Sequence, residues 1–198
     1  MKPFTHYNAR SIKETISLLL EYEEKAMINA GGTDLLGAMR DNCMPEYPEA
    51  IINIKTINDL DYIRKNQKGL RIGALAKLAD IARSSEAKEG FNLLAEAAYS
   101  VASPHIRNMA TLGGNLCQGV RCWYYRYPHQ IGGPILCARK GSGPCHAVRG
   151  DNRYHAVLGG KKCFAVCPSD IAVALAAFDA RIVIEHAAHG THITECLF

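Results

Sequence analysis

The sequence predicts an α+β fold interrupted in its second half by one long irregular segment. Short runs with strand character alternate with runs whose apolar residues recur at helical spacing, before residue 103 and again after residue 168. Residues 103–168 are too rich in glycine and turn residues to form regular elements. Six of the eight cysteines lie between Cys117 and Cys167. Because a loop of this length is usually functional, we expect these cysteines to hold a metal cluster that orders it.

The first elements are a capped helix, a strand and a second helix. Ser11 precedes apolar residues at helical spacing, and Glu14 stands three residues after it, as in a capping box. A short buried strand is predicted over residues 26–30, and a brief helix begins at Leu35.

The remaining elements follow from the same patterns. Ser103-Pro104 is expected to end a helix, because proline cannot continue one. The predicted elements are a strand at 50–54, a hairpin of 60–64 with 70–73, helices at about 76–84 and 90–102, a helix at 170–175, and strands at 181–184 and 191–198.

Composition excludes some functions. The 23 Lys and Arg residues against 19 Asp and Glu residues give a net charge of +4, which neither gathers into a basic arm nor alternates with aromatic residues. Nucleic-acid binding is therefore not expected. A chain of 198 residues can bury a core without disulfide staples.

The N-terminal residues and the apolar runs indicate the compartment. The first residues lack the pattern of a secretory signal. No apolar run approaches the roughly 18 residues of a membrane span. We expect a cytoplasmic location without a membrane span, where cysteines stay reduced and bind metal in preference to forming disulfides.

Two glycine-containing segments have the character of anion-binding loops. Gly31-Gly32-Thr33-Asp34 lies where a strand passes into a helix, and free backbone N–H groups at such a point can hold a phosphate. Taken alone, a plain tight turn is the better interpretation. Gly113-Gly114-Asn115 offers the same donors. Two such loops in one small domain suit a diphosphate.

These loops also carry a family resemblance. Residues 29–36, residues 106–115 and Pro168-Ser169-Asp170-Ile171-Ala172 resemble, in order, three motifs of the FAD-binding medium subunit of molybdenum hydroxylases, the xanthine dehydrogenase and carbon monoxide dehydrogenase family. The resemblance implies a two-lobed FAD-binding domain of the PCMH/VAO-like type, with lobes at 1–57 and 58–198. It also implies that the C-terminal domain usual in the family, of about a hundred residues, is absent.

The same resemblance implies the flavin-binding residues. One loop would contact the FAD diphosphate through backbone N–H groups, a second segment would form the opposite wall, and Asp170 would accept hydrogen bonds from ribityl or ribose hydroxyls. A helix N-terminal carboxylate is the alternative role of Asp170. The implied residues are Asn29, Ala30, Gly31, Gly32, Thr33, Asp34, Leu35, Ala110, Thr111, Gly114, Asn115 and Asp170.

The insert at about 117–167 resembles that of the 4-hydroxybenzoyl-CoA reductase β subunit, which holds a [4Fe–4S] cluster. The matching segments are 121–125, Cys137, Cys145-His146 and 159–165. On that basis the four ligands are Cys122, Cys137, Cys145 and Cys163.

Other assignments of the cysteines and histidines remain open. Cys117 and Cys167 are interpreted as small buried packing residues near the flavin, and Cys43 and Cys196 as structural residues. Zinc is the alternative metal, although the C-x-x-C knuckles of zinc ribbons are missing. His146 or His155 could replace a thiolate, and the trio His186, His189 and His192 is interpreted as surface. The aromatic residues 123–125 and Tyr127 would shield a cofactor or simply pack the insert.

The resemblance implies an electron-transfer role with no catalytic residue in this chain. FAD and the cluster would connect a large molybdopterin subunit and a small [2Fe–2S] subunit to a ferredoxin-like carrier, in support of reductive chemistry. Oxidative hydroxylation with electrons leaving through FAD is the alternative. The competing hypothesis from another class is a zinc-stabilised scaffold or binding subunit without redox activity.

Overall fold

The computed structural model describes residues 1–67, 69–186 and 190–194, with side chains described up to residue 185. Two compact units make up the chain. The smaller unit contains residues 1–3, 34–47 and 118–168, and the larger contains residues 4–33, 48–117 and those from 169 onward. The predicted insert therefore falls almost wholly within the smaller unit. The predicted lobes at 1–57 and 58–198 divide the chain differently from these two units, and the lobe boundary near residue 57 stays a prediction.

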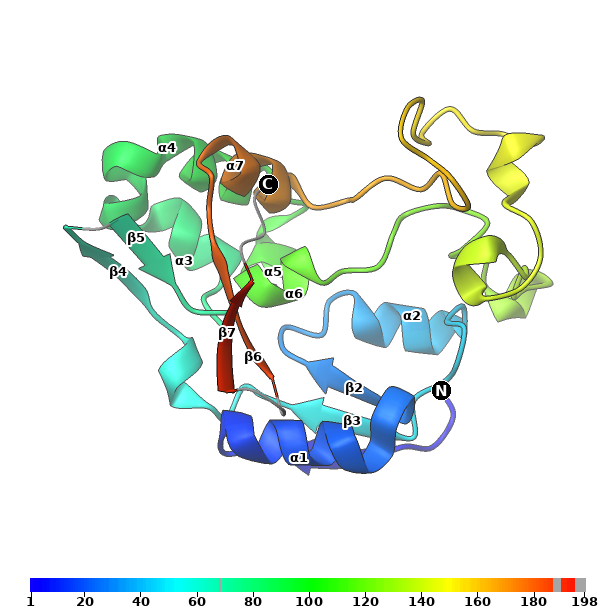
Figure 1. Cartoon of the computed structure of the whole chain (residues 1–198), viewed down its shortest axis with the longest axis horizontal. Helices are drawn as coiled ribbons and strands as arrows, with labels where there is room; N and C mark the ends of the chain where they lie inside the picture. Colours follow the sequence, from blue (N-terminus) through cyan, green and yellow to red (C-terminus); the bar gives the residue numbers. More distant parts are fainter. Residues whose placement is uncertain (68, 187–189, 195–198) are drawn as a thin grey trace. The chain divides into compact units, whose positions relative to one another are not determined.

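A parallel three-stranded sheet lies in the larger unit, in the order β1-β3-β2. Its register aligns three asparagines at the carboxyl ends of the strands, and α1 runs along it (Figure 1). Every residue of the central strand is buried. The elements are β1 Thr5–Asn8, α1 Ile12–Tyr22, η1 Glu23–Lys25, β2 Ala26–Asn29 and β3 Ala50–Asn53.

The start of this unit confirms one prediction and adds a strand. Ser11 caps α1 by accepting a hydrogen bond from the Glu14 amide at 3.1 Å, while Glu14 accepts one from the Arg10 amide at 2.8 Å. Strand β1 was not predicted. Three of its four residues are exposed, so the strand lacks the alternation of apolar and polar residues that would predict it. It forms by pairing with β3, which is distant in the sequence.

The helices α3, α4 and α7 pack together in the larger unit (Figure 1). Their core includes Leu78, Ile81, Leu94, Ala98 and Ile171. The elements are η2 Asn58–Leu60, the hairpin β4 Ile63–Asn66 and β5 Gly69–Ile72, α3 Leu78–Arg83, α4 Ser85–Ser100 and α7 Asp170–Ala177. The predicted helices and hairpin exist, with two differences. The first hairpin strand was predicted at 60–64 but runs from 63 to 66, after a 3-10 turn that was not predicted. Helix α4 begins five residues early and is kinked over 89–91, where Gly90 has φ +106°.

Ser103-Pro104 begins a helix here instead of ending one. Helix α4 ends at Ser100, and Ser103 then caps α5 Pro104–Arg107 with proline in its first turn, a position where the missing N–H costs nothing. A further short helix, α6 Leu112–Leu116, follows. The prediction of irregular structure from residue 103 onward is therefore wrong for residues 104–116.

The smaller unit contains α2 Leu35–Asp41 and the insert. Residues 118–168, all of which are described, form only three 3-10 turns: η3 His129–Ile131, η4 Ala138–Lys140 and η5 His146–Val148. The Gln130 amide donates to the Arg40 carbonyl at 2.8 Å and so joins the insert to α2. Among the described helices, none is both long and apolar enough to cross a bilayer.

The last described elements are the antiparallel strands β6 Ile182–His186 and β7 Gly190–Thr194. They agree with the predicted strand at 181–184 and with the start of the one at 191–198. Cys196 and the rest of that predicted strand lie outside the described residues, as do Lys68 and His189. The side chains of His186 and His192 are also not described.

Candidate functional site

Residues 29–33 of the first predicted flavin motif lie against the second motif in the larger unit. A Cβ added to Gly31, which follows β2, would stand 2.3 Å from the Met109 carbonyl oxygen and 2.9 Å from the Ala110 Cα. Only glycine permits this approach. At the end of β2, Asn29 is buried, and its Oδ1 has no hydrogen-bond partner among the described residues. The Asn29-to-Thr33 loop thus offers an unused buried acceptor and a backbone that meets the second motif.

The second motif is a capped helical turn, not the open loop that its glycines suggest. Thr111 caps α6 and accepts a hydrogen bond from the Gly114 amide at 3.2 Å. Asn115 is buried, and its Oδ1 accepts a hydrogen bond from the Ser169 hydroxyl at 2.6 Å. That hydroxyl also accepts from the Ala172 amide at 3.0 Å and so caps α7.

The third motif is thus joined to the second through Asn115 and Ser169. Asp170 is the first residue of α7 and is exposed, as expected of a helix N-terminal carboxylate. Its role toward the flavin hydroxyls stays a prediction. Residues 29–33, 106–115 and 169–172 of the three motifs, far apart in sequence, lie within the larger compact unit.

Asp34 has partners that sequence reasoning missed. The Arg126 guanidinium Nη2 donates to both carboxylate oxygens at 2.9 Å, the Gly119 amide donates to Oδ2 at 2.9 Å, and Arg121 donates to Oδ1. Burial raises the pKa of the Asp34 carboxyl, but the hydrogen bonds from Arg126, Arg121 and Gly119 outweigh burial, and the pKa lies below its usual value. The side chain of Asp34 therefore holds the start of the insert.

Replacing Asp34 with asparagine should loosen the smaller unit. Loss of the charge from a hydrogen-bonded, half-buried carboxylate is expected to destabilise the fold by about 1–3 kcal/mol near neutral pH. Since the folded-state pKa is depressed, this contribution is complete above the unfolded-chain value of about 3.9 and declines as the pH falls through the folded-state pKa. Thermal unfolding and limited proteolysis of the insert measure the effect.

The matched control for Asp34 is Asp151→Asn. Asp151 also pairs with an arginine, Arg153, but both side chains are exposed. We expect no measurable change in the unfolding temperature, because exposed ion pairs contribute little. Equal unfolding temperatures for both variants and the wild type would show that Asp34 does not secure the insert.

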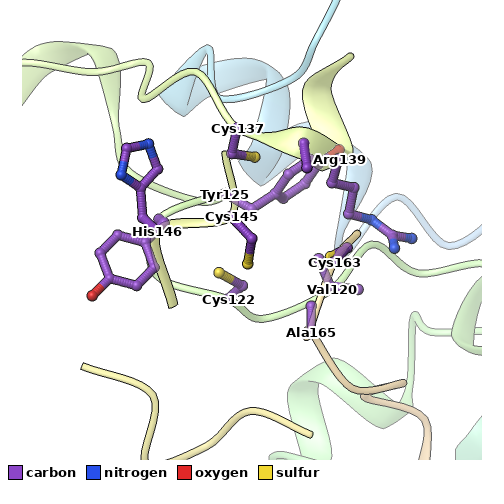
Figure 2. A pocket seen from close by; sticks show the side chains of 11 residues that line it. Val120, Cys122, Tyr125, Cys137, Arg139, Cys145, His146, Cys163 and Ala165 are labelled. Atoms are coloured by element: carbon purple, nitrogen blue, oxygen red, sulfur yellow. The ribbon is translucent and has the colours of Figure 1, made fainter. Parts of the chain in front are cut away.

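Four cysteines of the insert line one small pocket of the smaller unit, and these are the four that were predicted as ligands. Figure 2 shows Cys122, Cys137, Cys145 and Cys163 around this space, reached from separate stretches of the insert. The rest of its lining is mostly apolar or aromatic and includes one cation, Arg139; the apolar and aromatic members are Val120, Tyr124, Tyr125, Ala138 and Ala165. All seven cysteines among the described residues are free thiols. The described residues include no cluster of three or more His, Cys, Asp or Glu side chains placed to hold a single metal ion.

Tight turns present these thiols. Cys137 caps η4, and its carbonyl accepts from the amides of Lys140 at 2.9 Å and Ser142 at 3.3 Å. The Cys122 carbonyl accepts from the Arg126 amide at 2.9 Å, and the Cys145 carbonyl from the Val148 amide at 3.2 Å. Each of these three cysteines therefore begins a turn, which fixes its backbone.

The remaining described cysteines lie elsewhere. Cys43 is buried, and its Sγ lies 3.6 Å from the Ala38 carbonyl oxygen, in keeping with a structural role. The expectation that Cys117 and Cys167 are buried is wrong, because both are exposed. Cys117 follows the last residue of α6, and Cys167 lies in irregular backbone before Pro168, so no element covers them.

Two histidines and several aromatic side chains surround the pocket. The Nε2 atom of buried His155 lies 3.2 Å from Cys122 Sγ. The Trp123 ring packs edge-on against those of Tyr124, Tyr154 and His155. His146 lines the pocket, but its Nε2 lies 2.8 Å from the Leu136 carbonyl oxygen. The aromatic residues therefore both pack the insert and cover the thiols.

The larger unit is an α+β fold in which the glycine motifs meet near the carboxyl ends of a parallel sheet, where such sheets commonly bind ligands. Residues 2–195 match the family described as the FAD binding domain in molybdopterin dehydrogenase. The chain belongs to this family.

Individual proteins show how far the similarity extends. The aldehyde oxidoreductase FAD-binding subunit PaoB of Escherichia coli (strain K12) is 37% identical over 182 residues, which are 91% of this chain and 55% of that protein. The nicotinate dehydrogenase FAD-subunit of Eubacterium barkeri is 37% identical over 117 residues, 59% of this chain and 39% of that protein. This chain thus spans about half or less of the length of these relatives. The match to PaoB is long enough to run through most of the insert.

Solved structures agree with the fold. A carbon monoxide dehydrogenase from Hydrogenophaga pseudoflava superposes with a TM-score of 0.55 and 34% identity, covering 58% of this chain and 40% of that one. A Cu,Mo-CO dehydrogenase in its cyanide-inactivated form has a TM-score of 0.55 and 30% identity, covering 59% and 41%.

Proposed function

We propose that this chain is part of the electron-transfer flavoprotein subunit of a multisubunit molybdenum-containing hydroxylase or reductase. It would bind FAD and a [4Fe–4S] cluster and work with a molybdopterin-binding large subunit and a [2Fe–2S] small subunit. FAD exchanges electrons in pairs or singly, whereas an iron–sulfur cluster exchanges them one at a time. The observation that carries the cluster assignment is the pocket lined by four thiols in a chain of a flavin-binding family.

The larger unit supplies the groups that FAD requires. The backbone of residues 29–33 would hold the diphosphate, with Ala110, Thr111, Gly114 and Asn115 opposite and Asp170 at the flavin hydroxyls. The buried and unpartnered Asn29 Oδ1 fits a ligand that brings a donor, since buried acceptors are rarely left unpaired. The Gly114 amide already donates a hydrogen bond to the Thr111 side chain. Gly114 would therefore serve FAD by allowing it to approach the backbone closely.

A cluster suits the cysteine pocket better than zinc does. A single zinc ion draws four sulfurs to about 2.3 Å from one point, and the described residues lack any group placed in that way. In an iron–sulfur cluster each thiolate binds a different iron atom. The four sulfur atoms can therefore line one pocket without meeting at a single point. The insert resembles that of the 4-hydroxybenzoyl-CoA reductase β subunit, and this resemblance favours an iron–sulfur cluster over zinc.

Analysis of the purified protein tests this proposal directly. We expect flavin absorbance near about 450 nm together with about four iron and four sulfide per chain. We also expect molybdopterin-binding and [2Fe–2S] subunits to copurify from the native source. A colourless protein that contains one zinc per chain would establish the scaffold alternative instead.

The charge of the insert supports a ferredoxin-like carrier as the outside partner. Residues 118–168 contain eight Lys and Arg residues and one acidic residue, a net charge of +7, whereas the whole chain carries +4. The expectation that the positive charge is not gathered is therefore wrong for the insert. An open hollow on the insert is lined by residues 141–144, Cys145 and Lys162. Cys145 therefore borders both the cysteine pocket and the surface. An acidic one-electron carrier fits this place.

Ionic strength tests the carrier. Electron exchange with an acidic ferredoxin should slow as salt rises, because screening weakens attraction between exposed charges. Lys162→Glu should slow it further at low salt. Lys13→Glu, the same charge change on exposed α1, should have no effect. Rates that are independent of salt and equal in both variants would exclude docking at this hollow.

A further inference from the structure

One lysine, Lys140, ends in a buried ammonium group beside the cysteine pocket. The Nζ atom of Lys140 is buried and has no hydrogen-bond partner among the described residues, although the side chain as a whole is partly exposed. Buried ammonium groups are normally paired, since burial removes their hydration. No carboxylate among the described residues pairs with it, so the position suits an added negative charge.

The groups that face Lys140 identify where that charge would be. Its ammonium lies 5.3 Å from the centroid of the Tyr125 ring, and that ring lines the cysteine pocket. Burial lowers the pKa of Lys140, while the nearby thiols of Cys137, Cys43 and Cys122 act in the opposite direction when they carry negative charge. Two of these three are proposed ligands. Thiols become thiolates when they bind metal, so loading the pocket would provide the missing charge.

The backbone fixes Lys140 in this place. It is the last residue of η4, which Cys137 caps, and its amide donates to the Cys137 carbonyl at 2.9 Å. Gly141 follows in the left-handed region with φ +80° and turns the chain away. The backbone of Lys140 therefore keeps a defined position relative to the proposed ligand Cys137, and its ammonium is buried, unlike the side chains of the exposed Lys161 and Lys162.

We propose that Lys140 is a buried counter-charge beside the cysteine pocket, additional to Arg139 in its lining, and raises the reduction potential of the cluster that the four thiols hold. A positive charge in a poorly hydrated place stabilises an added electron, and net charge near a cluster is one of the factors that set its potential. This inference rests on the proposed function, because it requires the cluster.

Redox titration of the cluster, followed by its electron paramagnetic resonance signal, tests the proposal in the assembled protein. Lys140→Met should shift the midpoint potential to a more negative value, Lys140→Arg should keep it near that of the wild type, and the exposed-lysine control Lys161→Met should not change it. Lys140→Met with full iron content and an unchanged potential would overturn the proposal.

If Lys140→Met loses its cluster, its potential cannot be measured, and the iron content of the variants tests the proposal instead. Loss of iron in Lys140→Met and Lys140→Gln with retention in Lys140→Arg would show that the charge itself is needed, as proposed. Loss in all three variants would show that only the shape of the lysine side chain matters and would overturn the proposal. Absence of iron from the wild type is a failure of the proposed function and is recognised before any variant is made.

Discussion

Replacing Cys145 with serine should remove most of the iron from the protein and leave FAD bound. Cys145 is one of the four thiols that line the pocket, and a cluster with three thiolates is poorly held because each iron needs its ligand. Residues 29–33, 106–115 and Asp170 of the flavin motifs lie in the other compact unit, so we expect their geometry not to depend on this thiol. Iron and sulfide analysis and the flavin absorbance of the same sample measure the two effects separately.

Cys117→Ser and Cys167→Ser are the controls for this experiment. Both residues belong to the same cysteine-rich segment, but they are exposed and do not line the pocket. We expect both variants to keep the full iron content. If Cys145→Ser also kept it, or if Cys117→Ser lost it, the ligand set would have to be revised.

Replacing Gly31 with alanine should disrupt FAD binding and destabilise the larger unit. The added Cβ would meet the Met109 carbonyl oxygen at 2.3 Å, and since that atom belongs to the backbone it cannot move aside as a flexible side chain could. The two flavin motifs would be pushed apart, at a cost of about 1–3 kcal/mol of stability, as in other overpacked sites. Flavin content and thermal unfolding measure the result.

Gly37→Ala provides the matched control. Gly37 lies within α2, and a Cβ there meets nothing within 4 Å. Alanine is the better helix former by about 1 kcal/mol, so we expect unchanged flavin content and equal or higher stability. Normal flavin content in Gly31→Ala would contradict the assignment of this loop to FAD.

The parts of the fold that the sequence predicted are those specified by local signals. The cap at Ser11 and the strand-to-helix passage around residues 31–34 can be recognised from adjacent residues, and both exist in the structure. Strand β1 depends on pairing with residues about 45 positions away, and its own side chains carry no pattern. Thr111 and Ser103 were overlooked as caps because the glycines and the proline after them suggested a loop.

Likewise, only part of the candidate site could be predicted from the sequence. The four pocket cysteines were chosen by resemblance, and their common pocket supports the choice. The partners of Asp34 lie 85–92 residues away along the chain, a separation at which sequence patterns indicate nothing. The burial of the Lys140 ammonium could not be predicted from the sequence either, because a lysine in a basic segment ordinarily lies in solvent.

The hydrogen bond between Ser169 and Asn115 bears on how such an insert can be acquired. It joins two points of the chain that are 54 residues apart, one on each side of the insert, within a single compact unit. The entropy lost in closing a loop grows only logarithmically with its length, by about 0.6 kcal/mol for each doubling. Even three doublings of a connection at this point therefore cost only about 2 kcal/mol, so that a flavin domain closed by this hydrogen bond can accept a long added segment while its own core stays unchanged.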